Sequence, residues 1–267
     1  MKNKSDFLRF SIELAKDAGK IQMSYFGKLS SLNKKSTSID LLTIADKESE
    51  TYIINKIKKF YPTHSILSEE SGEINNKNEY RWIIDPLDGT TNFVHNLPIF
   101  AVSIALQKNN RTICAVVYNP AADKCFYAQK ESSAYLNDRK INVSKSDNLN
   151  DCLLVTGFPY LHDKRYDLSF DIFKEFYDKT RGLRRLGAAA LDLCFVAMGR
   201  FDGYYEYHLH PWDICAGSFI LEQSGGKVTD WDNSKLKLSG ERILATNNYI
   251  HTKMINVLNQ DKYKLFF

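Results

Sequence analysis

The chain has 267 residues, of which 43% are apolar and 25% are charged, a balance typical of globular proteins. The net charge of +4 is small, and no predicted element carries a basic stripe with interleaved aromatic residues, so we expect no nucleic-acid surface. No stretch approaches the roughly 18 apolar residues of a membrane span, and the N-terminus lacks a signal-peptide core, which predicts a cytoplasmic protein without membrane contact. The five cysteines show no CxxC spacing and fit reduced thiols.

The first half of the chain predicts two helices followed by strands. Apolar residues recur at helical spacing over 5–26, and Ser5 can cap that helix. The polar stretch 27–40 predicts a hairpin or loop, and a second helix is expected from about Asp46 to Phe60. Strands are then predicted for "HSILSEES", "YRWIIDP", "FAVSIALQK" and "TICAVVYNP". "KCFYAQK" and "SAYLNDRKINV" predict a meander with a turn near Asn137 and Asp138.

The second half alternates strands and helices. Strands are predicted for "CLLVTGF", "FDGYYEYH" and "RILATNN", and helices for 167–179, 188–198, 212–224 and 249–260. Gly199 and the pair at 225–226 end two of these helices. The pattern predicts one α/β domain over 1–267, built from an N-terminal lobe of about 1–145 and a C-terminal lobe of about 146–267.

Acidic residues gather where the predicted elements begin or end. They are Asp46, Glu69, Glu70, Asp85, Asp88 and Asp213. Buried carboxylates repel one another unless they face water or surround a cation. A cluster of oxygen ligands alone suits Mg²⁺, Mn²⁺ or Ca²⁺. For the pair at 69–70 a solvated loop stays an open alternative, but Asp85 directly follows an apolar strand and is carried to the edge of the core.

The stretch "WIIDPLDGTTNF" also holds a corner suited to an anion. Pro86 stiffens the turn, and Gly89 permits close approach of the backbone. Thr90 or Thr91 can cap a following helical turn whose free N–H groups point outward. Carboxylates for cations beside N–H groups for an anion predict a site for a phosphate ester.

The motif "WIIDPLDGTTNFVH" resembles the central signature of the inositol monophosphatase family of Mg²⁺-dependent, lithium-sensitive phosphatases. "HPWDICAGSFILEQSGG" resembles the second family signature, and "LSEES" supplies the expected pair of glutamates upstream. The resemblance implies a layered α-β-α-β-α sandwich of the inositol monophosphatase and fructose-1,6-bisphosphatase type, of mixed α/β class. It also implies a homodimer and a site between the two lobes.

The resemblance further implies roles for individual residues. Glu69, Asp85 and the backbone oxygen of Leu87 would hold one Mg²⁺, and Asp85, Asp88 and Asp213 a second. Glu70 would order water around the metals, and Lys35 would lie near the site, with two or three ions as the open alternatives. N–H groups of Gly89 and Thr90 would bind phosphate. Thr90, hydrogen-bonded to Asp46, would orient and deprotonate a water that attacks directly, activated by the metals. The catalytic residues would thus be Asp46, Thr90 and Glu69.

The remainder of the substrate would meet Asp88, the backbone around Ala189, and Glu206. Many family members have Gly-Ser or Gly-Thr at 187–188, where this chain has Gly-Ala, and Arg185 lies either near the pocket or on a solvated loop. Inositol monophosphate is the expected substrate. Fructose 1,6-bisphosphate, histidinol phosphate and 3′-phosphoadenosine 5′-phosphate are alternatives within the same chemistry. A regulatory protein that binds the RNA machinery is the alternative from another class.

Overall fold

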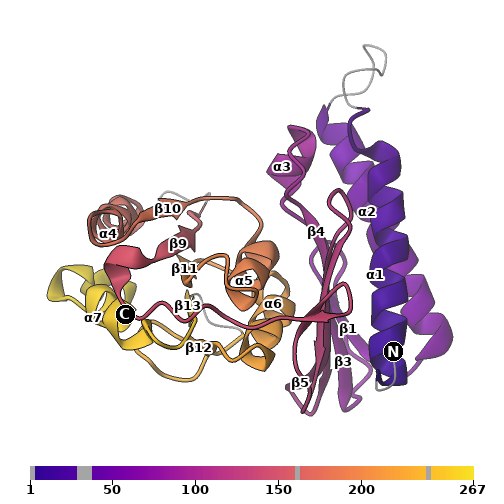
Figure 1. The fold of residues 1–267 in the computed structure, drawn as a ribbon. Helices are drawn as coiled ribbons and strands as arrows, with labels where there is room; N and C mark the ends of the chain where they lie inside the picture. Colours follow the sequence, from indigo (N-terminus) through magenta and orange to yellow (C-terminus); the bar gives the residue numbers. More distant parts are fainter. Residues whose placement is uncertain (1–3, 29–37, 160–162, 239–241) are drawn as a thin grey trace.

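The computed structural model describes residues 4–28, 38–159, 163–238 and 242–267 (Figure 1). The described helices are α1 (Asp6–Tyr25), α2 (Ser38–Phe60), α3 (Thr90–Val94), α4 (Tyr166–Lys179), α5 (Ala189–Ala197), α6 (Pro211–Gln223) and α7 (His251–Leu258), with 3₁₀ turns η1 (Leu149–Asp151) and η2 (Asp261–Phe266). None of these described helices combines the length and apolarity needed to traverse a lipid bilayer.

The strands form two sheets. The first has the order β2-β1-β3-β4-β5-β6-β7-β8, and the second the order β10-β9-β11-β13-β12. The first sheet comprises β1 (Ser65–Ser68), β2 (Gly72–Ile74), β3 (Tyr80–Asp88), β4 (Ala101–Lys108), β5 (Arg111–Asn119), β6 (Lys124–Gln129), β7 (Tyr135–Leu136) and β8 (Arg139–Lys140). The second comprises β9 (Leu153–Thr156), β10 (Gly182–Arg184), β11 (Gly203–Tyr207), β12 (Lys227–Thr229) and β13 (Arg242–Thr246).

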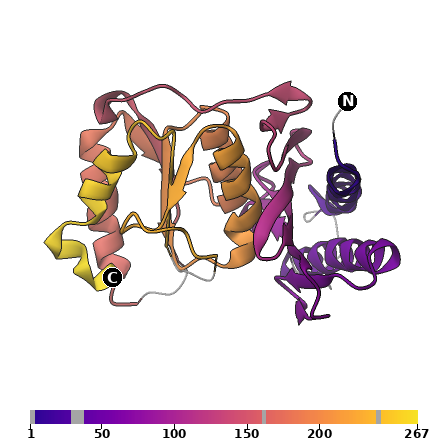
Figure 2. The same cartoon turned by 90° about the horizontal axis from the view of Figure 1, so that it is seen from below.

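The elements stack in five layers, which Figure 2 shows edge-on. Helices α1 and α2 cover one face of the first sheet, α5 and α6 lie between the sheets, and α4 and α7 cover the far face of the second sheet (Figures 1 and 2). Three apolar cores fill the spaces between layers. The expected α-β-α-β-α sandwich is therefore confirmed.

Burial of both faces explains the composition of the middle layers. Seven of the nine residues of β3, Trp82 to Asp88, are buried, because helices cover both sides of the first sheet. Helix α5 is apolar nearly all round, as expected of a helix enclosed between two sheets. By contrast, α1 has one buried stripe, and its cap is the one expected, since the Ser5 hydroxyl oxygen accepts the N–H of Leu8 at 3.2 Å.

The start of the second helix was predicted wrongly. Helix α2 begins at Ser38, so Asp46 lies inside the helix and does not open it. The reason is that Ala45, directly before Asp46, is fully buried in an apolar cluster with Leu87 and Phe93, so helix α2 already packs against the rest of the protein upstream of Asp46. The last three residues of the expected loop thus belong to the helix, and 29–37 lie outside the described residues.

Candidate active site

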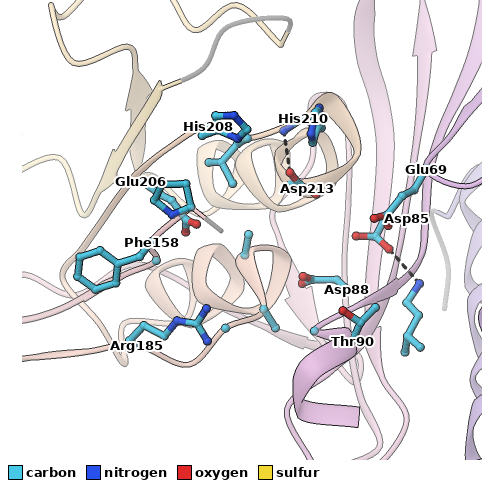
Figure 3. A pocket seen from close by; sticks show the side chains of 18 residues that line it. Glu69, Asp85, Asp88, Thr90, Phe158, Arg185, Glu206, His208, His210 and Asp213 are labelled. Carbon is cyan, nitrogen blue, oxygen red and sulfur yellow. Dashed lines mark hydrogen bonds between the residues drawn. The ribbon is translucent and has the colours of Figure 1, made fainter. Parts of the chain in front are cut away.

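A cavity of about 390 Å³ lies between the two halves of the chain (Figure 3). Its walls come from the end of β3 and the start of α3 on one side, and from the ends of β9 and β11 and the starts of α5 and α6 on the other. Most residues expected at a site line it: Glu69, Asp85, Leu87, Asp88, Gly89, Thr90, Arg185, Ala189, Glu206 and Asp213.

A β-bulge brings two of these acids together. Alternation along a strand would point Asp85 and Asp88, three residues apart, to opposite faces. In β3, however, Asp85 pairs with Ser103 and Asp88 with Ala101, so one extra residue is inserted between them. The extra residue restores a common direction, and both carboxylates line the cavity. The N–H of Leu87 donates to Oδ1 of Asp85 at 2.9 Å and fixes the bulge.

The turn after β3 is tighter than expected. Gly89 is the N-cap of α3 with a left-handed φ of 88°, and no side chain caps this helix, so the expected threonine cap is wrong. A Cβ on Gly89 would lie 2.7 Å from the backbone oxygen of Ile99, which leaves no room for a larger residue. The first N–H groups of α3 have no partner inside the helix, as at every helix start.

The second half of the chain supplies the facing wall. Asp213 lies in the first turn of α6 and accepts the N–H of His210 at 2.7 Å. Glu206 lies one residue before the end of β11 and accepts the hydroxyl of Tyr204 at 2.6 Å. Ala190, in the first turn of α5, donates its N–H to Oδ2 of Asp88 at 2.9 Å, which links the two walls.

The carboxylates at the cavity hold protons unusually strongly. Burial and then repulsion from Asp213 raise the pKa of Asp88 to about 8. Desolvation and then Asp213 raise the pKa of Glu69 to about 7, and burial raises the pKa of Glu206 to about 7. The pKa of Asp85 lies well above its usual value because this fully buried group also faces Glu69.

These groups suit a hard divalent cation. Every side-chain donor in the set is a carboxylate oxygen, and none of these acids forms an ion pair with a basic side chain among the described residues. A bound cation would offset the repulsion that raises their pKa values. Within the described parts of the chain, no three acidic, imidazole or thiol groups are close enough together to coordinate one metal ion as they stand. The carboxylates line the cavity wall but do not form a complete coordination site.

Two expected residues, Asp46 and Glu70, lie outside the lining. Asp46, in α2, is buried, and its Oδ1 has no hydrogen-bond partner, so the expected bond from Thr90 is not made to this atom. Burial and then Glu69 raise the pKa of Asp46 to about 8. Glu70 is exposed beside the cavity, and Lys35 lies outside the described residues.

Sequence reasoning missed part of the outer wall. His208 and His210 both line the cavity, and neither is among the residues expected there. His208 has a positive φ of 65°, a conformation that non-glycine residues rarely adopt and that is enriched at functional sites. Phe158 and Gly157 also line the cavity, and a Cβ on Gly157 would lie 2.2 Å from both carboxylate oxygens of Glu206. The available signal was the pair of alternating histidines at the start of the second signature, His208 just before it and His210 as its first residue.

Comparison with known proteins finds relatives along nearly the whole chain. The family model described as "Inositol monophosphatase family" matches residues 3–263. An inositol-1-monophosphatase from Synechocystis is 43% identical over 94% of this chain and 88% of its own length. A putative Nus factor SuhB from Neisseria meningitidis is 41% identical over 95% and 98%. A fructose-1,6-bisphosphatase/inositol-1-monophosphatase from Thermotoga maritima is 35% identical over 96% of each.

A solved structure has the same fold. The inositol monophosphatase from Anabaena (Nostoc) superposes with a TM-score of 0.84 at 43% identity, over 94% of this chain and 94% of its own.

Proposed function

Since this chain belongs to the inositol monophosphatase family, we propose that it is a Mg²⁺-dependent phosphomonoesterase that hydrolyses inositol monophosphate to inositol and phosphate. The family and the relatives indicate a phosphatase, and the family is generally metal-dependent. One observation carries the proposal: the buried carboxylates of Asp85 and Asp88 line one cavity with those of Glu69, Glu206 and Asp213, beside the N–H corner of a helix start.

We assign the metal ligands to the carboxylates of Glu69, Asp85, Asp88 and Asp213 and to the backbone oxygen of Leu87, for two or three Mg²⁺ ions. Bound there, Mg²⁺ would polarise the phosphate ester, lower the pKa of water and stabilise the leaving group. The protein's part is to hold these oxygens at one end of the cavity, through the bulge in β3 and the first turn of α6.

The phosphate would accept the N–H groups of Gly89 and Thr90. The Thr90 hydroxyl would orient the attacking water, and Asp46 would take its proton. The water oxygen would bond to phosphorus as the ester P–O bond breaks, and the departing alkoxide would take up a proton from a second water. Glu70 would order water at the rim.

The leaving group would contact Asp88, the backbone at Ala189, and Glu206. Arg185 is exposed and lines the same cavity. Its guanidinium group could donate a hydrogen bond to a hydroxyl or phosphate oxygen of the substrate. The name of the Synechocystis relative supports inositol monophosphate, and that of the Thermotoga relative supports fructose 1,6-bisphosphate as an alternative. Histidinol phosphate and 3′-phosphoadenosine 5′-phosphate belong to the same chemistry.

A substrate panel tests the proposal. Phosphate release is measured from these four esters with Mg²⁺ and with EDTA. We expect Mg²⁺-dependent release, fastest from inositol 1-phosphate. Faster release from another of the esters would support a metal-dependent phosphatase whose preferred substrate is that ester. Release from none of them would contradict the proposed activity.

A second candidate function follows from the Neisseria relative, which is named a putative Nus factor. On this alternative the chain binds the RNA machinery, in contrast to the expectation of no nucleic-acid partner. A pull-down with and without Mg²⁺ separates the two: capture of transcription proteins or RNA, together with an inactive substrate panel, would favour it. The homodimer, the lithium sensitivity and the cytoplasmic location stay predictions, and light scattering coupled to gel filtration tests the first.

A further inference from the structure

The cavity is assembled from two halves of the chain, so its geometry depends on how the start of α3 meets the start of α5. Asn92, in α3, lies at this junction and is 5% exposed. Its Nδ2 donates to the backbone oxygen of Leu186 at 2.8 Å and lies 3.4 Å from that of Gly187. The same amide donates to the oxygen of Ile99 at 2.8 Å, within its own half of the chain.

Two further contacts flank this amide. Asp88 accepts the N–H of Ala190 at 2.9 Å, and a Cβ built on Gly89 would lie 3.1 Å from the Cβ of Ala188. Residues 88–92 therefore meet residues 186–190 through the hydrogen bonds of Asn92 and Asp88, and Gly89 lies close to Ala188 between them. The Asn92 side chain forms the hydrogen bond that holds the loop leading into α5. The same loop sets the position of the first turn of α5, and therefore the direction of the Ala190 N–H.

The chemistry of the contact favours a role beyond filling space. A buried amide whose donors satisfy backbone oxygens fixes those oxygens in place, and its loss leaves them without a partner. The oxygens at 186 and 187 belong to the last residues before α5. Movement of this loop therefore moves the N–H that orients Asp88.

We infer that Asn92 is a positioning residue for the reaction: by holding the loop at 186–187, it keeps the Ala190 N–H on Asp88 and so fixes the direction of that carboxylate toward Mg²⁺ and substrate. This inference rests on the proposed function. Groups that orient a metal ligand typically contribute ~10–100-fold to metal affinity or activity.

The test compares Asn92→Ser with a matched control, Asn119→Ser. Asn119 is also buried, at 3% exposed, and its Nδ2 donates to the oxygen of Pro98 at 3.0 Å while its Oδ1 accepts the N–H of Ala122 at 2.9 Å. The control thus loses a buried amide from the same half of the chain, but it does not touch residues 186–190. Both variants are checked for cooperative thermal unfolding.

Three quantities are measured on the full chain: Mg²⁺ binding by calorimetry without substrate, kcat and KM for the best ester, and hydrogen exchange of the segment 186–190. For Asn92→Ser we expect Mg²⁺ affinity and kcat to fall ~10–100-fold, KM to change less, and exchange to quicken. Asn119→Ser should lower the melting temperature while leaving Mg²⁺ affinity and kcat near wild type. If Asn92→Ser does not fold, Asn92→Thr, which keeps more volume, replaces it.

The outcomes separate the inference from the proposed function. Equal effects of the two variants on Mg²⁺ affinity, or unchanged exchange at 186–190, would overturn the role of Asn92. A wild-type protein that neither binds Mg²⁺ nor releases phosphate would instead overturn the proposed function.

Discussion

At the scale of single residues, the water-orienting group is the sharpest target. Thr90→Ala removes the proposed hydroxyl but keeps the backbone N–H that would bind phosphate. We expect kcat to fall by ~10²-fold with little change in the binding of inorganic phosphate, since general-base contributions are of this size. Thr90→Ser, which keeps a hydroxyl, should retain most of the activity. Weaker phosphate binding with unchanged kcat would contradict the assignment.

The close contact between Gly157 and Glu206 gives a second residue-scale prediction. An alanine at 157 would place its Cβ 2.2 Å from the Glu206 carboxylate, which must then move. We expect Gly157→Ala to raise KM for inositol 1-phosphate about tenfold while Mg²⁺ affinity stays near wild type. Steady-state kinetics and calorimetry measure the two. Unchanged KM would show that Glu206 does not contact the substrate.

At the scale of elements, His251 joins α7 to two strands. Its Nε2 lies 3.0 Å from the Thr229 hydroxyl in β12, and its Nδ1 lies 2.9 Å from the Thr246 hydroxyl in β13. Burial lowers the pKa of His251 to about 4. Below about pH 6.5 the unfolded chain therefore binds a proton that the folded chain does not, and the stabilising contribution of His251 is lost as the pH falls toward 4.

Urea unfolding of wild type and His251→Gln measures this contribution. At pH 7.5 we expect the wild type to be the more stable, and the difference in unfolding free energy to shrink steadily between pH 6.5 and 4.5. A difference that does not depend on pH would show that His251 is protonated in the folded protein as readily as in the unfolded chain.

The elements also show what the sequence could and could not supply. Long periodic segments such as α1 were predictable within a residue, because an amphipathic stripe and the cap at Ser5 are local signals. The start of α2 was not predictable in this way. An aspartate such as Asp46 is a common N-cap residue, but here the helix extends upstream of it through the buried Ala45. Three-residue strands such as β10 and β12 form through pairing with distant partners, which no local pattern encodes.

The same division holds at the site. The acids were identifiable from their types and positions, but not why Asp85 and Asp88 share a direction, because the bulge exists only through the pairing of β3 with β4. The exposure of His208 and His210 likewise depends on how β11 meets α6, which is set by packing. Distant contacts such as that of Asn92 with Leu186 are invisible in a single sequence.

At the scale of the whole molecule, the acidic cavity couples stability to metal and pH. Several carboxylates have folded-state pKa values raised to about 7 or 8, so between about pH 4 and 8 the folded protein binds more protons than the unfolded chain. The metal-free protein should therefore lose stability as the pH rises through this range. Mg²⁺ at 100 times its Kd should restore about 2.7 kcal/mol.

Thermal unfolding in EDTA and in Mg²⁺, at pH 6 and pH 8, checks this coupling. The melting temperature should rise by several degrees with Mg²⁺, and more at pH 8 than at pH 6, because carboxylates bind metal only when ionised. NaCl at matched ionic strength is the control for screening. An equal rise with NaCl would exclude a specific metal site.

The central claim is that the carboxylates of this cavity support hydrolysis of a phosphate ester, and Asp88 lies where both walls meet. The most direct measurement is phosphate release from inositol 1-phosphate by wild type and Asp88→Asn, each with Mg²⁺ and with EDTA. We predict release by the wild type that EDTA abolishes, and a folded Asp88→Asn protein that is slower by at least ~100-fold. Release that survives EDTA, or near-wild-type turnover by Asp88→Asn, would contradict the account.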